Sequence, residues 1–267
     1  MDDIRLKILG EHAGHPVRAR LTATTPGVVA GTPEAIAACH TLGLTVHQSL
    51  PPGTAVTAGS VLLEVSGPAL HVLAGEEVLA GCCGKASGVA TAARWFVERA
   101  AGRAQVVCGA WKKYPLAMKD LLRAGIAAGG VSIRITQDPF IYLDKNYVRV
   151  LGGIREALEQ AGPLLPRVPV IQVRGDWAPV PEEAELAARH GAGIIMVDNG
   201  CLRSAREAVS RLDQLGLRSR AKLAFGGGVD RDNFASALDT GVDIVEVGRA
   251  IIDASILDLR YDIVEGV

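Results

Sequence analysis

Aromatic residues are scarce in this chain of 267 residues, at 4% of the total. The shortage argues against a nucleic-acid-binding surface, because such surfaces stack bases on aromatic rings. The chain also lacks a charge imbalance, since 28 Lys and Arg residues oppose 29 Asp and Glu residues. A balanced charge gives no general attraction for nucleic acid or for an anionic membrane. We therefore expect neither as a partner.

Long apolar runs are absent as well. No run reaches the roughly 18 apolar residues of a membrane span, and the first residues do not open an apolar stretch of signal-peptide length. The five cysteines form no C-x-x-C pair and are odd in number. Such usage is typical of reduced, buried thiols. These features predict a cytoplasmic protein.

Residues 1–101 are turn-rich and strand-like, and they predict an α+β sandwich domain with an antiparallel sheet. Thr32 and Pro33 predict the start of a helix at 32–41, with Thr32 as its N-cap. A helical stretch at 74–101, interrupted near Gly84 and Gly88, carries small residues that indicate close packing. The strands are expected at 17–21, 44–47, 61–65 and 70–73.

Residues 102–267 repeat a strand–turn–helix pattern, which is typical of a parallel sheet. About six units favour an open, incomplete α/β barrel, with a flat doubly wound sheet as the alternative. The strands are expected at 106–108, 132–136 with 140–143, 168–173, 193–197, 222–225 and 243–247. The helices are expected at 115–124, 148–161, 181–190, 202–215 and 231–238.

Glycine-rich turns follow the last two predicted strands, at Gly226-Gly227-Gly228 and Gly248-Arg249. A glycine turn exposes backbone N–H groups, and a helix N-terminus behind it adds partial positive charge. The loops after the last strands of a barrel are a frequent phosphate site. These turns therefore predict phosphate binding, with tight turns of no further role as the alternative.

Polar residues occupy other strand ends, where the functional groups of a barrel lie. Alternation places Gln172 and Arg174 on the inward face, which favours a polar ligand over a structural network. Asp198 suits a ribose hydroxyl or a metal, and it equally suits capping of the Asp-Asn-Gly turn. Glu246 suits a catalytic role, or pairing with Arg249 or Lys222.

Histidine is missing from every predicted barrel strand end. Histidine-based acid–base or nucleophilic catalysis is therefore not expected there. The strand ends and their loops carry cations instead, which suit an anionic ligand. These candidates are Lys112, Lys113, Lys119, Arg134, Arg174 and Arg249, of which Lys119 is assigned to the solvated surface.

Seven segments, in order, match the motifs of one known family. They are 27–31 (G-V-x-A-G), 73–91 (L-x-A-E-R-T…R-x-S-G-I-A-T), 112–115 (within T-R-K-T-x-P-G), 129–134 (G-G-x-x-H-R), 197–199 (L-D-N), 223–228 (L-E-A-S-G-G) and 240–248 (T-G-V-D…V-G). The chain thus resembles the quinolinate phosphoribosyltransferases, of type II phosphoribosyltransferase fold.

This resemblance implies a homodimer in which one subunit's N-terminal domain covers the other's barrel. It also implies transfer of phosphoribose from phosphoribosyl pyrophosphate to a pyridine carboxylate, with magnesium (Mg2+). The glycine turns fall where the family holds the 5′-phosphate. Catalysis would rest on positioning and on electrostatic stabilisation of an oxocarbenium-like transition state.

The departures from the family pattern fall at functional positions. Glu77, Trp111 and Ile133 replace two arginines and a histidine, while Gln172 and Ala224 replace two glutamates. Lys145 is the candidate substitute for the lysine of L-I-K-D-N-H, and the N-terminal E-D-x-G-x-G-D-x-T segment is missing. The residues expected to bind phosphate (the phosphate end) are thus retained, whereas those expected to bind the acceptor (the acceptor end) differ from the family pattern.

Our first hypothesis is a divergent phosphoribosyltransferase that uses a heterocyclic, pyridine-type acceptor other than quinolinate, stacked on Trp111 and Tyr114, and releases pyrophosphate. One alternative is a lyase or another transferase acting on a phosphorylated heterocycle or nucleotide, with Lys112, Lys145 or Glu246 as acid or base. Another is a non-catalytic accessory protein, similar to family members encoded with molybdenum-transport systems.

The first hypothesis assigns roles to residues of both glycine turns and of the strand ends. The catalytic set is Lys112, Asp198 and Gln172, and Asp198 is also the metal ligand. The substrate-binding set is Trp111, Lys113, Arg134, Lys145, Arg174, Asn199 and Glu246. The phosphate-binding set is Gly226, Gly227, Gly228, Gly248 and Arg249.

Overall fold

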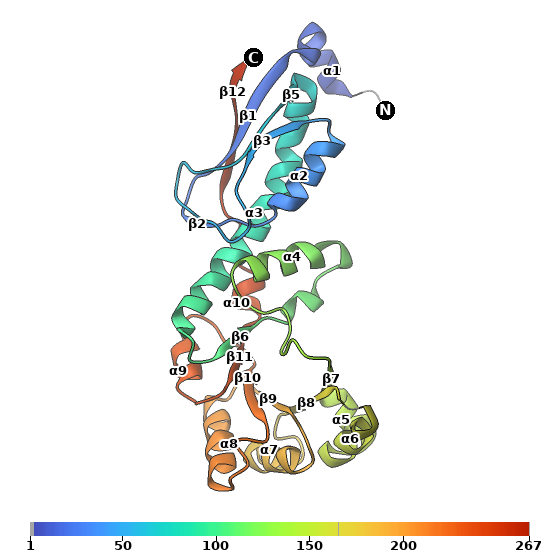
Figure 1. Cartoon of the computed structure of the whole chain (residues 1–267), viewed down its shortest axis with the longest axis vertical. Helices are drawn as coiled ribbons and strands as arrows, with labels where there is room; N and C mark the ends of the chain where they lie inside the picture. Colours follow the sequence, from blue (N-terminus) through green and yellow to red (C-terminus); the bar gives the residue numbers. More distant parts are fainter. Residues whose placement is uncertain (1–2, 165, 267) are drawn as a thin grey trace. The chain divides into compact units, whose positions relative to one another are not determined.

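The computed structural model describes residues 3–164 and 166–266, which group into two compact units (Figure 1). The first unit comprises Met1–Trp95, Trp111–Val131 and Ile251–Val267, and the second comprises Phe96–Ala110 and Ser132–Ala250. Both units are discontinuous in sequence, whereas the sequence prediction placed one boundary between residues 101 and 102.

An antiparallel sheet forms the centre of the first unit, as predicted. Its strand order is β12-β1-β5-β3. The C-terminal strand β12 pairs with β1, a long-range pairing that the sequence analysis did not predict. The strands are β1 (Pro16–Ala23), β3 (Thr45–Ser49), β5 (Val61–Pro68) and β12 (Leu259–Gly266), with a separate pair of β2 (Gly27–Val28) and β4 (Ala55–Val56).

The helices of the first unit differ from the prediction in two places. The expected strand at 70–73 is wrong, because a single uninterrupted helix α3 (Ala69–Ala100) begins directly after β5. Gly88 does not break α3. A Cβ at this position would overlap the carbonyl oxygen of Ser255, so the close approach of that backbone requires glycine. The glycine thus allows the close packing that the small residues predicted. The other helices are α1 (Ile4–Leu9), η1 (Gly10–Gly14), α2 (Thr32–Thr41), η2 (Ala110–Lys113) and α4 (Leu116–Ala128).

Helix α2 has the predicted bounds but a different cap. The N-cap residue is Gly31, with φ of 82°, and Thr32 is the first helical residue. The Thr32 hydroxyl donates to the carbonyl of Leu50 at 2.9 Å instead of capping the helix. The predicted N-cap was therefore wrong by one residue.

The second unit is the predicted open α/β barrel. Its six strands are all parallel, in the order β6-β11-β10-β9-β8-β7. The strands β6 and β7 are the two edges, so the described part of the sheet does not close. The strands are β6 (Gln105–Val107), β7 (Phe140–Leu143), β8 (Val168–Val173), β9 (Ile194–Asp198), β10 (Lys222–Gly226) and β11 (Ile244–Glu246).

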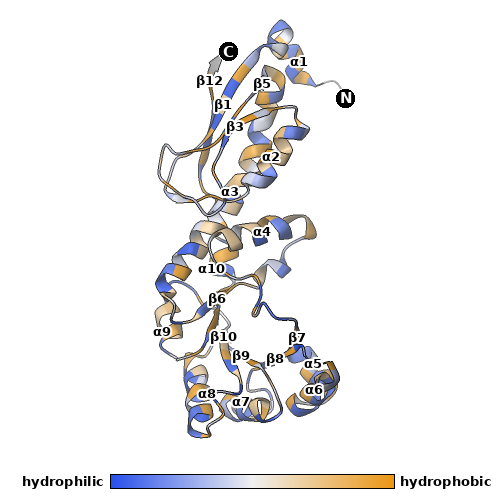
Figure 2. Ribbon diagram, in the orientation of Figure 1, coloured by the Kyte–Doolittle hydropathy of each residue, from blue (hydrophilic) through white to orange (hydrophobic). Residues whose placement is uncertain are grey.

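Helices follow the strands of this unit in the manner of βαβ repeats. Figure 2 shows that α7 and α8 carry both hydrophilic and hydrophobic residues, and α8 buries Ala205, Ala208 and Leu212. Such one-sided burial is what an amphipathic helix on a sheet requires. The helices are α5 (Lys145–Leu151), α6 (Ile154–Ala161), η3 (Gly162–Leu164), α7 (Val180–Arg189), α8 (Leu202–Gln214) and α9 (Phe234–Leu238). A last helix, α10 (Arg249–Ile252), begins in this unit and ends in the first.

Three predictions for this unit need correction. Residues 132–136 form no strand of their own, because only Ser132 makes an isolated bridge, to Val107. The helix predicted at 148–161 is two helices, since Gly152 and Gly153 adopt φ of 95° and 152° between them. Helix α9 begins at Phe234, three residues later than expected.

The inward face of the barrel is apolar at its centre and polar at the carboxyl ends of the strands. Val170, Ile194, Ala224 and Ile244 are buried together there. Because side chains alternate along a strand, the inward residues nearer the carboxyl ends include Gln172, Asp198 and Glu246. The sheet therefore brings polar groups together at one end of an apolar core.

None of the helices in the described part of the chain combines the length and the apolar character that crossing a membrane requires.

Candidate ligand-binding site

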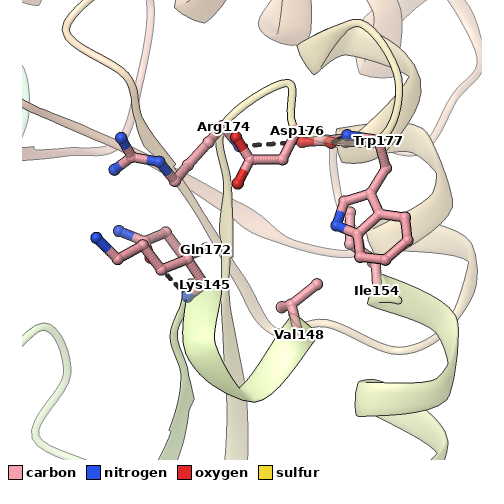
Figure 3. A pocket seen from close by; sticks show the side chains of 8 residues that line it. Lys145, Val148, Ile154, Gln172, Arg174, Asp176 and Trp177 are labelled. Atoms are coloured by element: carbon pink, nitrogen blue, oxygen red, sulfur yellow. Dashed lines mark hydrogen bonds between the residues drawn. The ribbon is translucent and has the colours of Figure 1, made fainter. Parts of the chain in front are cut away.

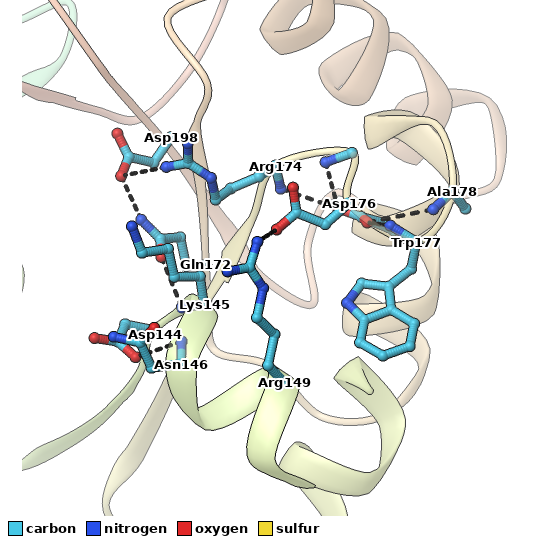
Figure 4. A network of polar contacts seen from close by, with 12 residues as sticks. Asp144, Lys145, Asn146, Arg149, Gln172, Arg174, Asp176, Trp177, Ala178 and Asp198 are labelled. Atoms are coloured by element: carbon cyan, nitrogen blue, oxygen red, sulfur yellow. Dashed lines mark hydrogen bonds and ion pairs between the residues drawn. The ribbon is translucent and has the colours of Figure 1, made fainter. Parts of the chain in front are cut away.

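A chain of polar contacts joins the carboxyl ends of β7, β8 and β9 (Figure 4). The Gln172 side-chain amide accepts a hydrogen bond from the backbone N–H of Lys145 at 2.8 Å. Its Nε2 donates to the Asp198 carboxylate. The Arg174 guanidinium approaches the same Asp198 oxygen at 3.4 Å. The structure thus brings together four residues that the sequence predicted as site residues.

The amide of Gln172 is suited to this place because it both accepts and donates. Gln172 is only 9% exposed, so its polar atoms need partners within the protein. A glutamate here would present a second acceptor to Asp198 and place two carboxylates in contact. With glutamine at position 172, Asp198 contacts a neutral amide and the Arg174 guanidinium, and the guanidinium partly offsets its negative charge.

The sequence left two roles open for Asp198, contact with a ligand or metal and capping of the turn, and the structure gives the capping role to Asn199. The Asn199 side-chain oxygen accepts from the backbone N–H of Cys201 at 3.0 Å and caps the turn. The Asp198 carboxylate instead contacts Gln172 and Arg174. The structure therefore places Asp198 in the polar chain and gives the turn-capping contact to Asn199.

A buried glutamate, which the sequence analysis missed, holds the loop that carries Arg174. Glu183 on α7 is 2% exposed. Its carboxylate accepts from the backbone N–H groups of Arg174, Gly175, Trp177 and Ala178 at 3.0, 2.8, 2.9 and 3.4 Å. Four donors compensate the burial of one charge. A charged residue on the buried face of an amphipathic helix was the available sequence signal.

A small pocket lies beside the polar chain, between this loop and helices α5 and α6 (Figure 3). Trp177 forms one wall and is 57% exposed. Val148 and Ile154 add apolar surface. Asp176 is paired with Arg149 on α5 at 3.1 Å. The pocket offers apolar and aromatic surface next to the side chains of Lys145, Gln172 and Arg174.

Two glycine turns meet at the ends of β9 and β10. The N–H of Gly200 donates to the carbonyl of Gly226 at 3.3 Å. A Cβ on Gly227 would lie 2.6 Å from the nitrogen of Gly200, so the turns approach too closely for a side chain. Gly227 and Gly228 have φ of 99° and 84°, which only glycine adopts readily. The three-glycine turn thus has a steric reason within the fold.

The prediction that a helix N-terminus stands directly behind the turn Gly226-Gly227-Gly228 is wrong. Helix α9 begins at Phe234, six residues after Gly228, and is five residues long. The intervening turn is stabilised by Asp230, whose carboxylate accepts from the N–H groups of Asp232 and Asn233. Any phosphate affinity must therefore come from the glycine backbone and nearby cations.

Family comparisons agree with this architecture. The model of the quinolinate phosphoribosyl transferase C-terminal domain matches residues 89–262, and that of the N-terminal domain matches residues 3–87. The chain belongs to the quinolinate phosphoribosyl transferase family.

The chain matches individual members of the quinolinate phosphoribosyl transferase family over most of their length. A nicotinate-nucleotide pyrophosphorylase (carboxylating) of Rattus norvegicus is 30% identical over 251 residues, covering 91% of this chain and 80% of the relative. A protein of Methanothermobacter thermautotrophicus, named "Probable nicotinate-nucleotide pyrophosphorylase", is 26% identical over 255 residues, covering 94% and 89%. The solved nicotinate-nucleotide pyrophosphorylase of Francisella tularensis has the same fold, with a TM-score of 0.84 at 20% identity, covering 98% and 90%.

Three predicted site residues of this family member belong to the first unit. Trp111, Lys112 and Lys113 lie in η2, and the first unit includes residues Trp111–Val131. The Arg123 guanidinium lies 3.8 Å from the Trp111 ring centroid, so one ring face is covered. The Tyr114 hydroxyl donates to Asp253 at 2.9 Å. Both rings predicted to stack on an acceptor thus already have protein contacts.

Three other predicted residues lie at the margins of the polar chain. Arg134 is exposed and lies 5.2 Å from the Phe140 ring centroid. Gly248 follows β11, and a Cβ there would make an ordinary 3.5 Å contact with Ala110, so no close approach demands glycine. Arg249 is exposed at the first residue of α10. The structure gives Gly248 no steric reason comparable to that of Gly227.

The magnesium ion that the family resemblance implies stays a prediction, because Mg2+ is commonly held by one or two carboxylates together with substrate phosphates. Among residues 3–164 and 166–266, no group of three or more His, Cys, Asp or Glu side chains is arranged to hold a metal. The predicted ligand Asp198 instead contacts an amide and a guanidinium. We therefore derive no step through a bound metal.

Proposed function

We propose that this family member is a phosphoribosyltransferase that transfers phosphoribose from phosphoribosyl pyrophosphate to a heterocyclic acceptor other than quinolinate. The observation that carries the proposal is the polar chain from Lys145 through Gln172 to Asp198, beside the glycine turns. These strand ends combine residues suited to a sugar phosphate with residues on the acceptor side that differ from the family pattern.

The phosphate end supports the sugar-phosphate half of the proposal. The turn at Gly226-Gly227-Gly228 presents a backbone without side chains, and a Cβ on Gly228 would meet no atom within 4 Å. Asp198 lies at the end of the neighbouring strand, in register with Gly226. A carboxylate beside a phosphate-binding backbone suits the hydroxyl groups of a ribose.

The acceptor end supports the change of acceptor. Glu77 replaces the arginine that would neutralise a carboxylate from across a dimer, and Glu77 is exposed on α3. Ile133 replaces a histidine, and Trp111 replaces an arginine. Each lost charge-assisted hydrogen bond removes about 1.5–3 kcal/mol of binding. A dicarboxylate therefore loses most of its anchoring in this chain.

The residues at the strand ends suggest a mechanism based on electrostatic positioning. As pyrophosphate leaves C1 of the ribose, positive charge develops on the sugar, and the Asp198 carboxylate stabilises it. Gln172 orients that carboxylate without adding negative charge. Arg174 neutralises part of the negative charge of Asp198. Together with Lys145, it also provides cationic groups for anionic parts of the substrates. Trp177, with Val148 and Ile154, provides an exposed surface for a planar ring, in place of the predicted Trp111 and Tyr114.

The proposal includes a homodimer, as the family resemblance implies, which sedimentation equilibrium would test. The enzymatic part is tested by calorimetric titration with phosphoribosyl pyrophosphate, with and without Mg2+, followed by assays of pyrophosphate release with pyridine-type acceptors. We expect binding of phosphoribosyl pyrophosphate and release with an acceptor other than quinolinate. Undetectable binding of phosphoribosyl pyrophosphate, or efficient turnover of quinolinate, would overturn the proposal.

A further inference from the structure

The loop between β8 and α7, residues 174–178, carries two of the side chains that the proposed function uses. Arg174 and Trp177 extend from it in opposite directions, Arg174 towards Asp198 and Trp177 towards the neighbouring pocket (Figure 4). Gly175, between them, is exposed and adopts φ of 83°. Exposed segments without regular structure are ordinarily the more mobile parts of a protein. A loop that presents two functional side chains therefore needs a group that holds it in place.

The Glu183 carboxylate divides its two oxygens between the two halves of this loop. Oε2 accepts from the backbone N–H groups of Arg174 and Gly175 at 3.0 and 2.8 Å. Oε1 accepts from those of Trp177 and Ala178 at 2.9 and 3.4 Å. One buried group on α7 thus determines the backbone position at both ends of the loop.

The Arg174 guanidinium depends on this backbone for its position. Within residues 3–164 and 166–266 its one polar contact is with Asp198, at 3.4 Å. That distance exceeds the usual range of an N–H···O hydrogen bond. The two side chains are 34% and 27% exposed, and solvent weakens such pairs. Asp198 by itself therefore does not fix the guanidinium.

The other side-chain tether of the loop is weaker than Glu183. Asp176 pairs with Arg149 on α5 at 3.1 Å, with side chains 34% and 59% exposed. Exposed ion pairs contribute little to stability. Glu183 is only 2% exposed, and hydrogen bonds to a charged acceptor are stronger in such surroundings. Glu183 is therefore the principal anchor of the loop.

We propose that Glu183 is a positioning residue of the proposed site: it is too buried to touch a substrate, and it holds Arg174 where the guanidinium can contact an anionic oxygen of phosphoribosyl pyrophosphate. This inference rests on the proposed function and assigns a role to a residue outside the predicted site. Its physical basis is preorganisation, because a cation that is already ordered loses less conformational freedom on binding.

A double-mutant cycle separates this role from a general effect on the fold. Calorimetric titration with phosphoribosyl pyrophosphate and Mg2+ would compare wild type, Arg174→Gln, Glu183→Gln and the double variant. We expect Arg174→Gln to weaken binding about tenfold or more, as loss of a charge-assisted hydrogen bond does. Glu183→Gln should weaken it at least about fivefold, and the double variant should stay within about twofold of Arg174→Gln, because effects that act through one contact are not additive. A general loosening of the fold would multiply the two losses instead.

Two further variants complete the test. Glu183→Asp keeps the buried charge, but its side chain is one methylene shorter and cannot reach both halves of the loop. It should show the same non-additivity with Arg174→Gln, with circular dichroism confirming the fold, should Glu183→Gln not fold. Glu182→Gln is the matched control, because Glu182 is exposed on α7. We expect it to bind phosphoribosyl pyrophosphate as wild type does.

The outcomes distinguish this inference from the proposed function. Affinity within about twofold of wild type in the folded Glu183 variants, or losses that multiply in the double variant, would overturn the positioning role alone. Wild-type protein that does not bind phosphoribosyl pyrophosphate would overturn the proposed function, and the positioning role with it.

Discussion

The side-chain amide of Gln172 donates a hydrogen bond to the carboxylate of Asp198, across two neighbouring parallel strands. The same amide accepts from the backbone of Lys145, so both of its ends are used. This arrangement orders three strand ends with only one negative charge. The charge state of residue 172 is consequently a sensitive point of the structure.

Gln172→Glu should destabilise the fold by about 1–3 kcal/mol near pH 8, because two carboxylates would then face each other. The repulsion raises the pKa of a carboxyl in the folded variant above its unfolded value. The deficit should therefore shrink as the pH falls from about 7 to 4, since the folded variant takes up a proton more readily. Urea unfolding across this range measures the effect. Gln172→Met, which removes the hydrogen bonds without adding charge, should show a deficit independent of pH, and a Gln172→Glu protein as stable as wild type at pH 8 would contradict the argument.

Glu183→Gln should lower the free energy of unfolding by about 2–4 kcal/mol, because the amide cannot accept from four N–H groups and loses the charge that strengthens them. The adjacent Glu182→Gln is the control, and a change within about 0.5 kcal/mol is expected at that exposed position. Urea denaturation of both variants gives the comparison. Equal stability of the two variants would show that the loop 174–178 does not depend on the buried carboxylate.

Gly227→Ala and Gly228→Ala should differ although both glycines have positive φ. Each substitution introduces about 1–2 kcal/mol of backbone strain. Gly227→Ala also forces a Cβ against the backbone of Gly200, whereas Gly228 has open space. We expect the first variant to be the less stable by at least about 1 kcal/mol in thermal unfolding. The reverse order would mean that the two turns do not meet as described.

Cys201 should react faster with iodoacetamide near neutral pH than Cys39 or Cys83. Hydrogen bonding from the Ser204 hydroxyl, and then from backbone N–H groups, lowers the pKa of the Cys201 thiol. Burial raises the pKa of Cys39 to about 11 and that of Cys83 to about 12. The thiolate is the reacting form, so alkylation measured by mass spectrometry should follow this order.

Ser204→Ala should slow the alkylation of Cys201 near neutral pH and shift its rate profile to higher pH. Ser210→Ala, an exposed serine on the same helix, should leave the profile unchanged. Faster labelling of Cys39 or Cys83 than of Cys201 in the folded protein would contradict the assignment.

Local patterns predicted the second unit more accurately than the first. The apolar runs of β8, β9 and β10 were placed within a residue or two, because each strand is buried and bounded by turns. The segment after β5 was misassigned as a strand, since four apolar-rich residues suit either a strand or a buried helix. The pairing of β12 with β1 joins the two ends of the chain, and no local period contains that information.

The candidate site shows the same division. Alternation was sufficient to place Gln172 and Arg174 on one inward face, and composition was sufficient to mark the glycine turns. Neither could assign the buried contacts of Glu183, because they depend on how α7 docks against a loop that precedes it. Glu246 was ambiguous in sequence, and the strand register removed Lys222 as its partner, because Lys222 begins β10 whereas Glu246 lies beside the end of that strand.

The sequence by itself determined most of the alternation of strands and helices in the barrel, the family and the residues that end the central barrel strands, because hydrophobic period, turn chemistry and motif order are local properties of the chain. Only the tertiary structure decided which of those residues touch. Strand order brings Gln172 to Asp198 and gives Glu246 its place between Gly109 and Gly226, and such contacts follow from the packing of distant segments rather than from any pattern within one of them.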